Sequence, residues 1–264
     1  MRNKKEFQTI LLLLEIPIAK VILHRPEVHN AFNDVMINEL LETFHHITDN
    51  KDIRLVILTG EGKSFCAGAD LNWMRRVKDY TFEENLKESL NLAELFYTIY
   101  SLPKPTIARV NGAAIGGGTG FVAVCDMAIA ASNAQFSFSE VKIGVVPACI
   151  SPYVIRRIGE GRCREFFLTG ERLSAEKALE AGLINQVIPL EKLDESVNEM
   201  VNQLLSSGPE ALATCKELLK KVPAMNFEEV KKYTAEVIAG LRMSDEGQEG
   251  MTAFLEKRKP KWCE

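Results

Sequence analysis

The amino-acid sequence predicts an α/β fold, with a strand-rich body of residues 1–200 and a helical C-terminal segment of residues 201–264. Two apolar runs that each end in glycine or in Asn-Gly, 53–60 and 106–112, are typical of strands buried on both faces of a sheet. The stretch between them, and most of the chain after about residue 151, carries apolar residues at helical spacing. No internal repeat, low-complexity tract or linker interrupts this order.

The first part of the chain is predicted to form two strands and a capped helix. Residues 7–14 and 18–23 are apolar runs of strand length, and the loop HRPEVHNAF follows them. Asn33 and Asp34 are of the residue types that cap helices, and the stretch after them carries apolar side chains at helical spacing. These apolar positions are Met36, Leu40, Phe44 and Ile47.

Later elements alternate between loops, helices and strands. Residues 61–74 form a loop that runs into a helix start, and residues 82–101 form a long amphipathic helix that Pro103 closes. A glycine-rich loop follows the strand at 106–112, and 134–140 is a further short extended run. Three longer helices are predicted near the C-terminus, at 191–206, 209–220 and 227–243.

Composition excludes several classes of function. The chain has 264 residues, of which 46% are hydrophobic, and a net charge of −4, so no broad basic surface for nucleic acid is expected. Its six cysteines include no CxxC pair, and none pairs with a histidine at metal-ligand spacing, so we expect free thiols in a reducing compartment and no metal site. The run LLLLEIPI is short and broken by Glu15 and Pro17, which predicts neither a signal peptide nor a membrane span. We therefore expect a cytoplasmic protein.

The decapeptide NGAAIGGGTG at 111–120 raises the question of what its glycines make room for. Their spacing does not match the G-x-G-x-x-G of a dinucleotide-binding turn, and no lysine follows as in a phosphate-binding P-loop. Two interpretations remain: a close-packed turn without a ligand, or an oxyanion hole whose backbone N–H faces developing negative charge. A second small-residue turn, at 66–70, also follows a strand and opens a helix, so two donors are available for one oxygen.

Six stretches in this order resemble the enoyl-CoA hydratase/isomerase (crotonase) superfamily over nearly the whole chain. They are LHRPEVHNAFN (23–33), SFCAGADL (64–71), NGAAIGGGTG (111–120), CDMAIAASNAQFSFSEVKIGVVP (125–147), LTGERLSAEKALEAGLINQVIP (168–189) and SDEGQEGMTAFLEKRKP (244–260). The resemblance implies a crotonase-like spiral of ββα units with a C-terminal helical trimerisation segment, assembled as a homotrimer or as a hexamer built of two trimers. It also implies an acyl-CoA thioester substrate, which itself carries the coenzyme A, and no separate cofactor.

The resemblance assigns roles to individual residues. The backbone N–H groups of Ala69 and Gly117 match the family's oxyanion hole for the thioester oxygen, and Glu140 matches a glutamate that acts as general acid and base. Two fixed donors in a dry pocket favour the enolate-like state of a thioester over its ground state. The positions that match the coenzyme A site are Val28, Ala31, Ala67, Asp70, Leu71 and, for the coenzyme A phosphates, often reached from a neighbouring subunit, Lys257.

The chief departure from the family pattern is Gly120. Well-studied hydratases of the family position water with two glutamates, and Gly120 stands where the first is expected. Glu140 is therefore expected to carry most of the acid–base chemistry, among apolar neighbours that would raise its pKa: Phe136, Phe138 and Ile143. A lone glutamate is also the pattern of Δ3,Δ2-enoyl-CoA isomerases. Hydratase and isomerase both stay open, as does an inactive CoA-binding scaffold.

Two segments favour hydration of a short or branched 2-enoyl-CoA, which would make the protein a lyase. Residues 69–74 and 146–159 resemble bacterial methylglutaconyl-CoA hydratase-like proteins of leucine degradation, which tend to lack the first glutamate, so 3-methylglutaconyl-CoA is one candidate substrate. Candidates for holding the water are the Ala148 N–H and the hydroxyls of Ser139 and Ser151. Arg75 and Arg76, near the expected rim, are interpreted as a solvated helix face rather than a carboxylate site.

Overall fold

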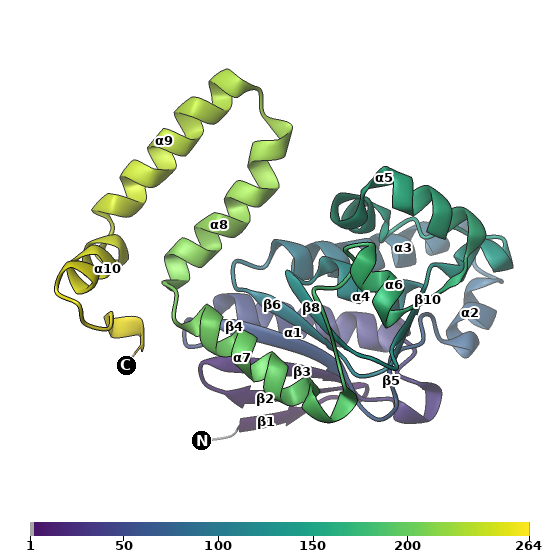
Figure 1. Ribbon diagram of the computed structural model, residues 1–264. Helices are drawn as coiled ribbons and strands as arrows, with labels where there is room; N and C mark the ends of the chain where they lie inside the picture. The colour runs from purple at the N-terminus through teal and green to yellow at the C-terminus, as the bar shows by residue number, and fades with distance from the viewer. Residues whose placement is uncertain (1–2, 264) are drawn as a thin grey trace. The chain divides into compact units, whose positions relative to one another are not determined.

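The structure, a computed structural model, describes residues 3–263. Its larger sheet has seven strands, which lie in this order: β1 (Asn3–Glu6), β2 (Ile10–Glu15), β3 (Ile18–Leu23), β4 (Leu55–Gly60), β6 (Thr106–Val110), β8 (Met127–Ala131) and β11 (Gln186–Ile188) (Figure 1). The first three strands pair antiparallel, and the pairs from β3 to β11 are all parallel. The six residues of β4 are all buried, as expected for a central strand.

A smaller sheet has four strands, in the order β10 (Arg172–Ser174), β9 (Gln135–Ser137), β7 (Ala113–Ile115) and β5 (Ser64–Cys66). β5, β7 and β9 run parallel, whereas β10 pairs antiparallel with β9. The chain moves between the two sheets at each step, since β4, β6 and β8 of the larger sheet lead directly into β5, β7 and β9. Successive turns therefore form a spiral of two-strand units.

Helices complete these units. They are α1 (Asp34–Asp49), α2 (Leu71–Val77), α3 (Phe82–Ser101), α4 (Gly117–Val124), α5 (Ser151–Thr169) and α6 (Ala175–Glu180). α1 begins where the sequence predicts, because the Asn33 side chain accepts the N–H of Met36, and all four predicted apolar positions of α1 are fully buried. α3 begins with a capping box between Thr81 and Glu84 and ends at Ser101, as predicted.

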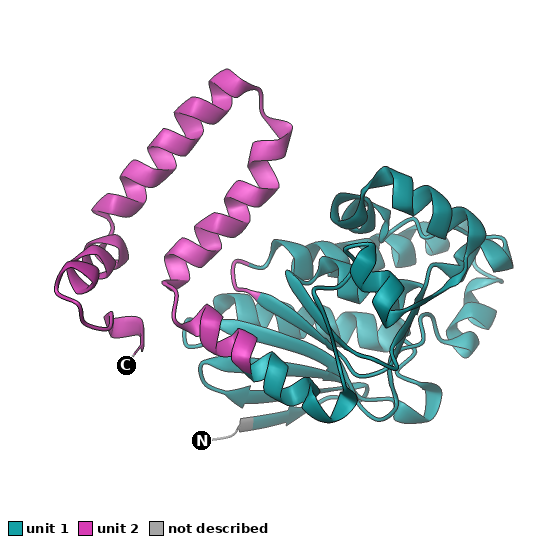
Figure 2. Ribbon diagram, viewed as in Figure 1, with its two compact units in different colours: residues 1–102, 106–198 teal, residues 103–105, 199–264 magenta. Residues whose placement is uncertain are grey.

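The chain divides into two compact units (Figure 2). The first comprises residues 1–102 and 106–198, and the second comprises residues 103–105 and 199–264. The division falls within α7 (Leu193–Leu205), after which come α8 (Pro209–Lys221), α9 (Phe227–Met243) and α10 (Asp245–Leu255). Inside the second unit, Glu246 on α10 accepts the N–H groups of Glu210 and Ala211 at the start of α8, at 2.9 Å each. No helix in the described part of the chain combines the length and the apolar character that a membrane span needs.

Three local features differ from the sequence prediction. β1 was not expected, and the run predicted as one strand at 7–14 begins only at Ile10. The glycine loop contains a strand, β7, and then a helix that starts within the glycines themselves. Glu140 lies in a 3-10 helix, Ser139–Ile143, rather than at the end of an extended run. Each difference falls where neighbouring segments, and not local propensity, decide the backbone.

Candidate active site

Three neighbouring strands of the smaller sheet deliver the predicted catalytic groups to one edge. β5, β7 and β9 are adjacent and parallel, so their carboxyl ends meet at the same edge of the sheet. Ala69 follows β5 by three residues, Gly117 follows β7 by two, and Glu140 follows β9 by three. Residues far apart in the sequence are thus brought together by the turns of the spiral.

The N–H of Ala69 points away from Phe32, the residue with which Ala69 forms a backbone bridge. Ala69 forms an isolated parallel bridge with Phe32, in which the Phe32 N–H donates to Gly68 O and the Asp70 N–H donates to Phe32 O, at 2.8 Å each. Because both neighbours of Ala69 bond to Phe32, the N–H and C=O of Ala69 itself face the opposite side. No acceptor for this N–H occurs among residues 3–263, so it is free to bind a ligand.

The N–H of Gly117 is free for a different reason. Gly117 is the first residue of α4, and the first turn of a helix has no intrahelical acceptors for its N–H groups. Gly116 before it has φ +54°, a left-handed conformation that favours glycine, and its own N–H donates to Ser137 O at 2.8 Å. The helix start is thereby tied to the end of β9, and its positive pole faces the site.

Glu140 lies beside this helix start. A Cβ added to Gly116 would stand 3.0 Å from Glu140 Oε1, which shows how closely the carboxylate approaches the glycine turn. The other oxygen, Oε2, is buried and has no hydrogen-bond partner within the described chain. Burial raises the pKa of the Glu140 carboxyl above its ordinary value. Glu140 is therefore suited to exchange protons nearer to neutral pH than a surface glutamate.

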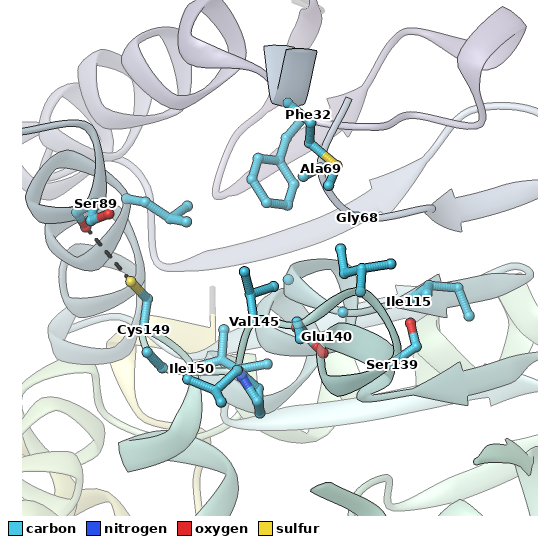
Figure 3. Close-up of a pocket in the computed structure, with 18 of the residues that line it drawn as sticks. Phe32, Gly68, Ala69, Ser89, Ile115, Ser139, Glu140, Val145, Cys149 and Ile150 are labelled. Carbon is cyan, nitrogen blue, oxygen red and sulfur yellow. Dashed lines mark hydrogen bonds between the residues drawn. The ribbon is translucent and has the colours of Figure 1, made fainter. Parts of the chain in front are cut away.

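These groups line one cavity of about 480 Å³. Ala69, Gly117 and Glu140 all contribute to its wall, together with side chains from α2, α3 and the segment 143–150 (Figure 3). Among its lining residues Glu140 is the only one with a charged side chain, and most of the others are apolar. Such a site is large enough for a small acyl group and has a low local dielectric, which strengthens hydrogen bonds to developing charge.

The position of the missing glutamate is filled by apolar side chains. A Cβ on Gly120 would lie 2.2 Å from Ile150 Cγ2 and 3.1 Å from Phe96 Cζ, and Ile150 and Phe96 also line the cavity. The space that a second carboxylate would need is therefore occupied. Among the residues that the structure describes, no group of three or more His, Cys, Asp or Glu side chains could hold a metal ion.

The predicted coenzyme A residues have different positions. Ala67 and Leu71 line the cavity, and Leu71 is 70% exposed at its mouth. Val28, Ala31 and Asp70 are not among the lining residues. Lys257 is part of the second unit, where it follows α10 with φ 57°.

Asp70 has a structural role in this structure. Its carboxylate accepts the N–H groups of Asn72 and Trp73 at the start of α2, at 2.7 and 3.1 Å. It also forms an ion pair with Arg25 at 2.8 Å, in which both side chains are mostly buried. Burial, the largest single influence, acts to raise the pKa of the Asp70 carboxyl. The hydrogen bonds and the ion pair together outweigh burial, so this pKa lies below its ordinary value. Asp70 thus fixes the turn that carries Ala69.

The candidate water-holding groups differ in their availability. The Ala148 N–H donates to Val146 O at 2.7 Å, and the Ser151 hydroxyl donates to Ala148 O at 2.8 Å. Both donors are therefore engaged, although Ala148 lines the cavity. Ser139 lines the cavity next to Glu140 (Figure 3), and its hydroxyl has no hydrogen-bond partner within residues 3–263. Ser139 is the remaining candidate.

Sequence reasoning did not identify several lining residues. Phe32 contacts the turns of both predicted donors, and only its place directly before the helix cap Asn33 distinguishes it in the sequence. Cys149 and Ser89 meet on the side of the cavity away from Ser139, where the Cys149 thiol donates to Ser89 O at 3.7 Å (Figure 3). This contact joins segments that are distant in the sequence, so no local pattern could have revealed it.

Arg75 and Arg76 do not face the cavity. Arg75 donates to Asn72 Oδ1 at 2.7 Å, and Arg76 pairs with Asp34 at 2.6 Å. Both contacts are on the exposed surface of α2, and neither arginine is among the lining residues. Their interpretation as a solvated helix face agrees with these positions.

Two donor turns and one buried carboxylate around an apolar cavity define a site that can polarise a carbonyl oxygen and move a proton beside it. The sequence profile described as enoyl-CoA hydratase/isomerase matches residues 15–264, and the chain belongs to this family. A protein of Thermus thermophilus named as an enoyl-CoA hydratase is 37% identical over 245 residues, which are 93% of this chain and 97% of that protein.

Solved structures agree with this assignment. An enoyl-CoA hydratase from Shewanella pealeana superimposes with a TM-score of 0.94 at 41% identity, covering 97% of both chains. An enoyl-CoA hydratase/isomerase from Marinobacter aquaeolei gives a TM-score of 0.93 at 32% identity, covering 98% of this chain and 100% of the other. The predicted crotonase-like α/β fold is thereby confirmed, and the chain is a member of an enzyme family.

Proposed function

We propose that this protein is an enoyl-CoA hydratase, a lyase that adds water across the C2–C3 double bond of a short or branched 2-enoyl-CoA. The observation that carries the proposal is the convergence of Ala69, Gly117 and Glu140 on one apolar cavity. Both backbone N–H groups lack acceptors within the described residues, and one oxygen of the nearby Glu140 carboxylate, Oε2, is buried without a hydrogen-bond partner there. These are the groups that addition of water to a thioester-activated double bond requires.

The mechanism uses Glu140 twice. Its carboxylate takes a proton from water as the water oxygen bonds to C3, and the π electrons move through C2 onto the thioester oxygen. The N–H groups of Ala69 and Gly117 stabilise the resulting enolate oxygen. Loss of one such donor lowers kcat by about 10²–10³-fold. The protonated Glu140 then donates to C2, which completes the addition and restores the carboxylate. We assign the orientation of the water to Ser139, because Ser139 lines the same cavity beside Glu140.

The cavity wall favours an uncharged acyl group. No Lys, Arg or His occurs among the described residues that line it, and its only charged side chain is Glu140. The carboxylate of 3-methylglutaconyl-CoA would have no counter-ion there and would stand near an anionic group, which is costly in an apolar site. An unbranched or methyl-branched monocarboxylic acyl group therefore has more support than the dicarboxylic candidate.

A second candidate is Δ3,Δ2-enoyl-CoA isomerisation, which the single carboxylate of the cavity also supports. In that reaction Glu140 removes a proton from C2 of a 3-enoyl-CoA and returns it at C4, and the same two N–H groups hold the dienolate oxygen. The two reactions differ in whether water enters. The filled space at Gly120 leaves only Ser139 and Glu140 to hold a water, so this alternative needs a direct test.

The test uses two substrates, one active-site variant and one control variant. Crotonyl-CoA should lose its enoyl-thioester absorbance and yield 3-hydroxybutyryl-CoA, and Glu140→Gln should lower kcat by about 10²–10⁴-fold while CoA-thioester binding persists. The matched control is Glu160→Gln, because Glu160 is an exposed glutamate on α5 outside the cavity lining. Conversion of 3-hexenoyl-CoA to the 2-enoyl isomer without hydroxyacyl product would favour the isomerase. Binding without turnover of either substrate would identify a scaffold.

We also propose that the second unit mediates assembly into a homotrimer or a hexamer and that Lys257 contacts the coenzyme A phosphates. Large apolar side chains on its helices are strongly exposed, with exposed fractions of 76–88% at Leu219, Phe227, Met243, Phe254 and Leu255. Such surfaces mark interaction sites in soluble proteins. Light scattering after size-exclusion chromatography would measure the assembly, and Lys257→Ala should weaken coenzyme A binding more than binding of the dephosphorylated pantetheine thioester.

A further inference from the structure

We propose that Phe32 is a positioning residue that sets the separation between the two oxyanion donors, Ala69 N–H and Gly117 N–H. The inference rests on the proposed function, since it concerns the same oxyanion hole. Phe32 belongs to neither donor turn: it lies in the loop before α1 and is 2% exposed. It is nevertheless in contact with both turns.

The main chain of Phe32 holds the first donor. Its N–H donates to Gly68 O and its C=O accepts the Asp70 N–H, so Ala69 is fixed between two hydrogen bonds of 2.8 Å to one residue. The residue before it is also held, since the Arg25 guanidinium donates to Ala31 O at 2.6 Å and pairs with the carboxylate of Asp70. The direction of the Ala69 N–H thus depends on where the Phe32 main chain lies.

The ring of Phe32 lies against the second donor. A Cβ built on Gly117 would be 2.6 Å from Phe32 Cε1 and 2.7 Å from Cζ, and the three atoms nearest to it all belong to this ring. Gly117 does not have a left-handed backbone, unlike Gly116, so the ring alone requires glycine at this position. The helix start that carries the second N–H therefore rests directly on the Phe32 ring.

The same ring separates the two helices that begin at the donors. Its centroid is 5.8 Å from that of Trp73 on α2 and 5.8 Å from that of Phe121 on α4, the latter in an edge-to-face arrangement with an interplanar angle of 82°. One side chain thus fills the space between both helix starts. Packed interiors leave little room for rearrangement, so the ring acts as a spacer of fixed thickness.

This spacing has a direct chemical consequence. Both donors must lie about 2.7–3.1 Å from a single oxygen in the transition state, and a displacement of about 1 Å can cost about 10²-fold in rate. A smaller side chain at position 32 would leave a gap into which α4 can move, which would change the geometry of one donor relative to the other. The effect should appear mainly in kcat, because the two N–H groups bind the negatively charged oxygen of the transition state more strongly than the carbonyl oxygen of the ground state.

The experiment compares Phe32→Leu with Phe44→Leu, since Phe44 is fully buried on α1 but does not line the cavity. Both variants lose the same volume from the core. We expect Phe32→Leu to lower kcat by about 10–100-fold with KM little changed, and Phe44→Leu to lower it less than about threefold at matched stability. Equal losses of kcat in the two variants would overturn the proposal.

A spectroscopic readout separates this proposal from the proposed function. The thioester C=O stretching frequency of bound butyryl-CoA, an unreactive analogue, reports the hydrogen bonds to its oxygen. In the unmodified protein the frequency should be lower than in free butyryl-CoA. An unchanged frequency would refute both the oxyanion hole and the proposed function. Phe32→Leu should show only part of this downward shift, whereas Phe44→Leu should show all of it. A full shift in Phe32→Leu would refute the positioning role alone.

A double-mutant cycle tests the contact itself and does not depend on one variant alone. Gly117→Ala should be strongly impaired, because its Cβ would overlap the Phe32 ring. In the Phe32→Ala background the same change should cost far less, because the overlapping atoms are gone. We expect the two effects on kcat to differ by at least about tenfold, and additive effects would contradict the proposal.

Discussion

Replacing Gly120 by alanine should destabilise the protein, although alanine is the better helix former. Gly120 lies inside α4, where the exchange alone would stabilise by about 0.5–1 kcal/mol. The added Cβ would stand 2.2 Å from Ile150 Cγ2, however, and 3.0 Å from Ile150 Cβ. Ordinary carbon–carbon contacts are about 3.5 Å or longer, so Ile150 would have to move by at least about 1.3 Å.

The expected magnitude follows from these distances. Forcing one extra carbon into a packed core costs about 1–3 kcal/mol, which exceeds the gain in helix propensity. For a unit of this size each kcal/mol corresponds to a change in Tm of about 2–4 °C, so Gly120→Ala should lower Tm by several degrees. A glutamate at this position would add the cost of a buried carboxylate, so restoring the family's first glutamate should need a smaller residue at Ile150 as well.

Thermal unfolding followed by circular dichroism measures this effect, and Gly161 provides the control. Gly161 is also helical, on α5, but a Cβ there would meet no atom within 4 Å. Gly161→Ala should therefore raise Tm, and Gly120→Ala should lower it. Ile150→Ala should relieve most of the cost of Gly120→Ala in the double variant. A Tm that rises in Gly120→Ala as it does in Gly161→Ala would refute the steric account of this glycine.

Four further predictions concern the residues of the site. Because burial raises the pKa of Glu140 and the carboxylate form is the base, kcat/KM for hydration should fall as the pH drops through that raised value, above the ordinary 4.5. The same burial makes the folded protein bind a proton more tightly than the unfolded chain, so stability should decrease as pH rises through this range; Glu140→Gln should remove this part of the pH dependence of Tm. Arg25→Met should cost about 3–5 kcal/mol in the free energy of unfolding, because it leaves the buried Asp70 carboxylate without its counter-ion. Arg25→Met with Asp70→Asn should recover part of this loss in urea titrations. Finally, kcat/KM for 3-methylcrotonyl-CoA should exceed that for 3-methylglutaconyl-CoA by at least about tenfold, since the lining residues include no cation; the opposite preference would show that a cation reaches the acyl group.

The sequence predicted most of the long elements because their patterns are local. Strand β3 and helix α3 begin and end where expected, and the cap at Asn33 was identified from its residue type. The glycine segment was harder, since its structure depends on neighbours: a Cβ on Gly118 would meet Cys66 O at 2.2 Å, and one on Gly117 would meet Phe32. The glycines at 116–118 are therefore needed for two reasons: close packing against neighbouring segments, and a free N–H at the start of α4.

Only part of the candidate site could be predicted from the sequence. The motifs indicated Ala69, Gly117 and Glu140, and the structure brings them to one cavity. The contribution of Phe32 depends on a bridge to a distant turn, and the filled space at Gly120 depends on a residue thirty positions further along the chain. These contacts between distant residues form only when the chain folds into the spiral, so they could not be predicted from local patterns in the sequence.

The alternation of the chain between two sheets has a consequence for how such an enzyme can change. The groups proposed to act on the thioester lie directly after short strands whose register is fixed by their neighbours. The rest of the cavity wall comes mainly from the long connecting segments that follow β5 and β9. Changes in the length or sequence of those connecting segments can alter which acyl chain fits without moving the two N–H donors or Glu140. Chemistry and selectivity are thus encoded in separable parts of one polypeptide, and new substrates can be explored while the reaction is kept.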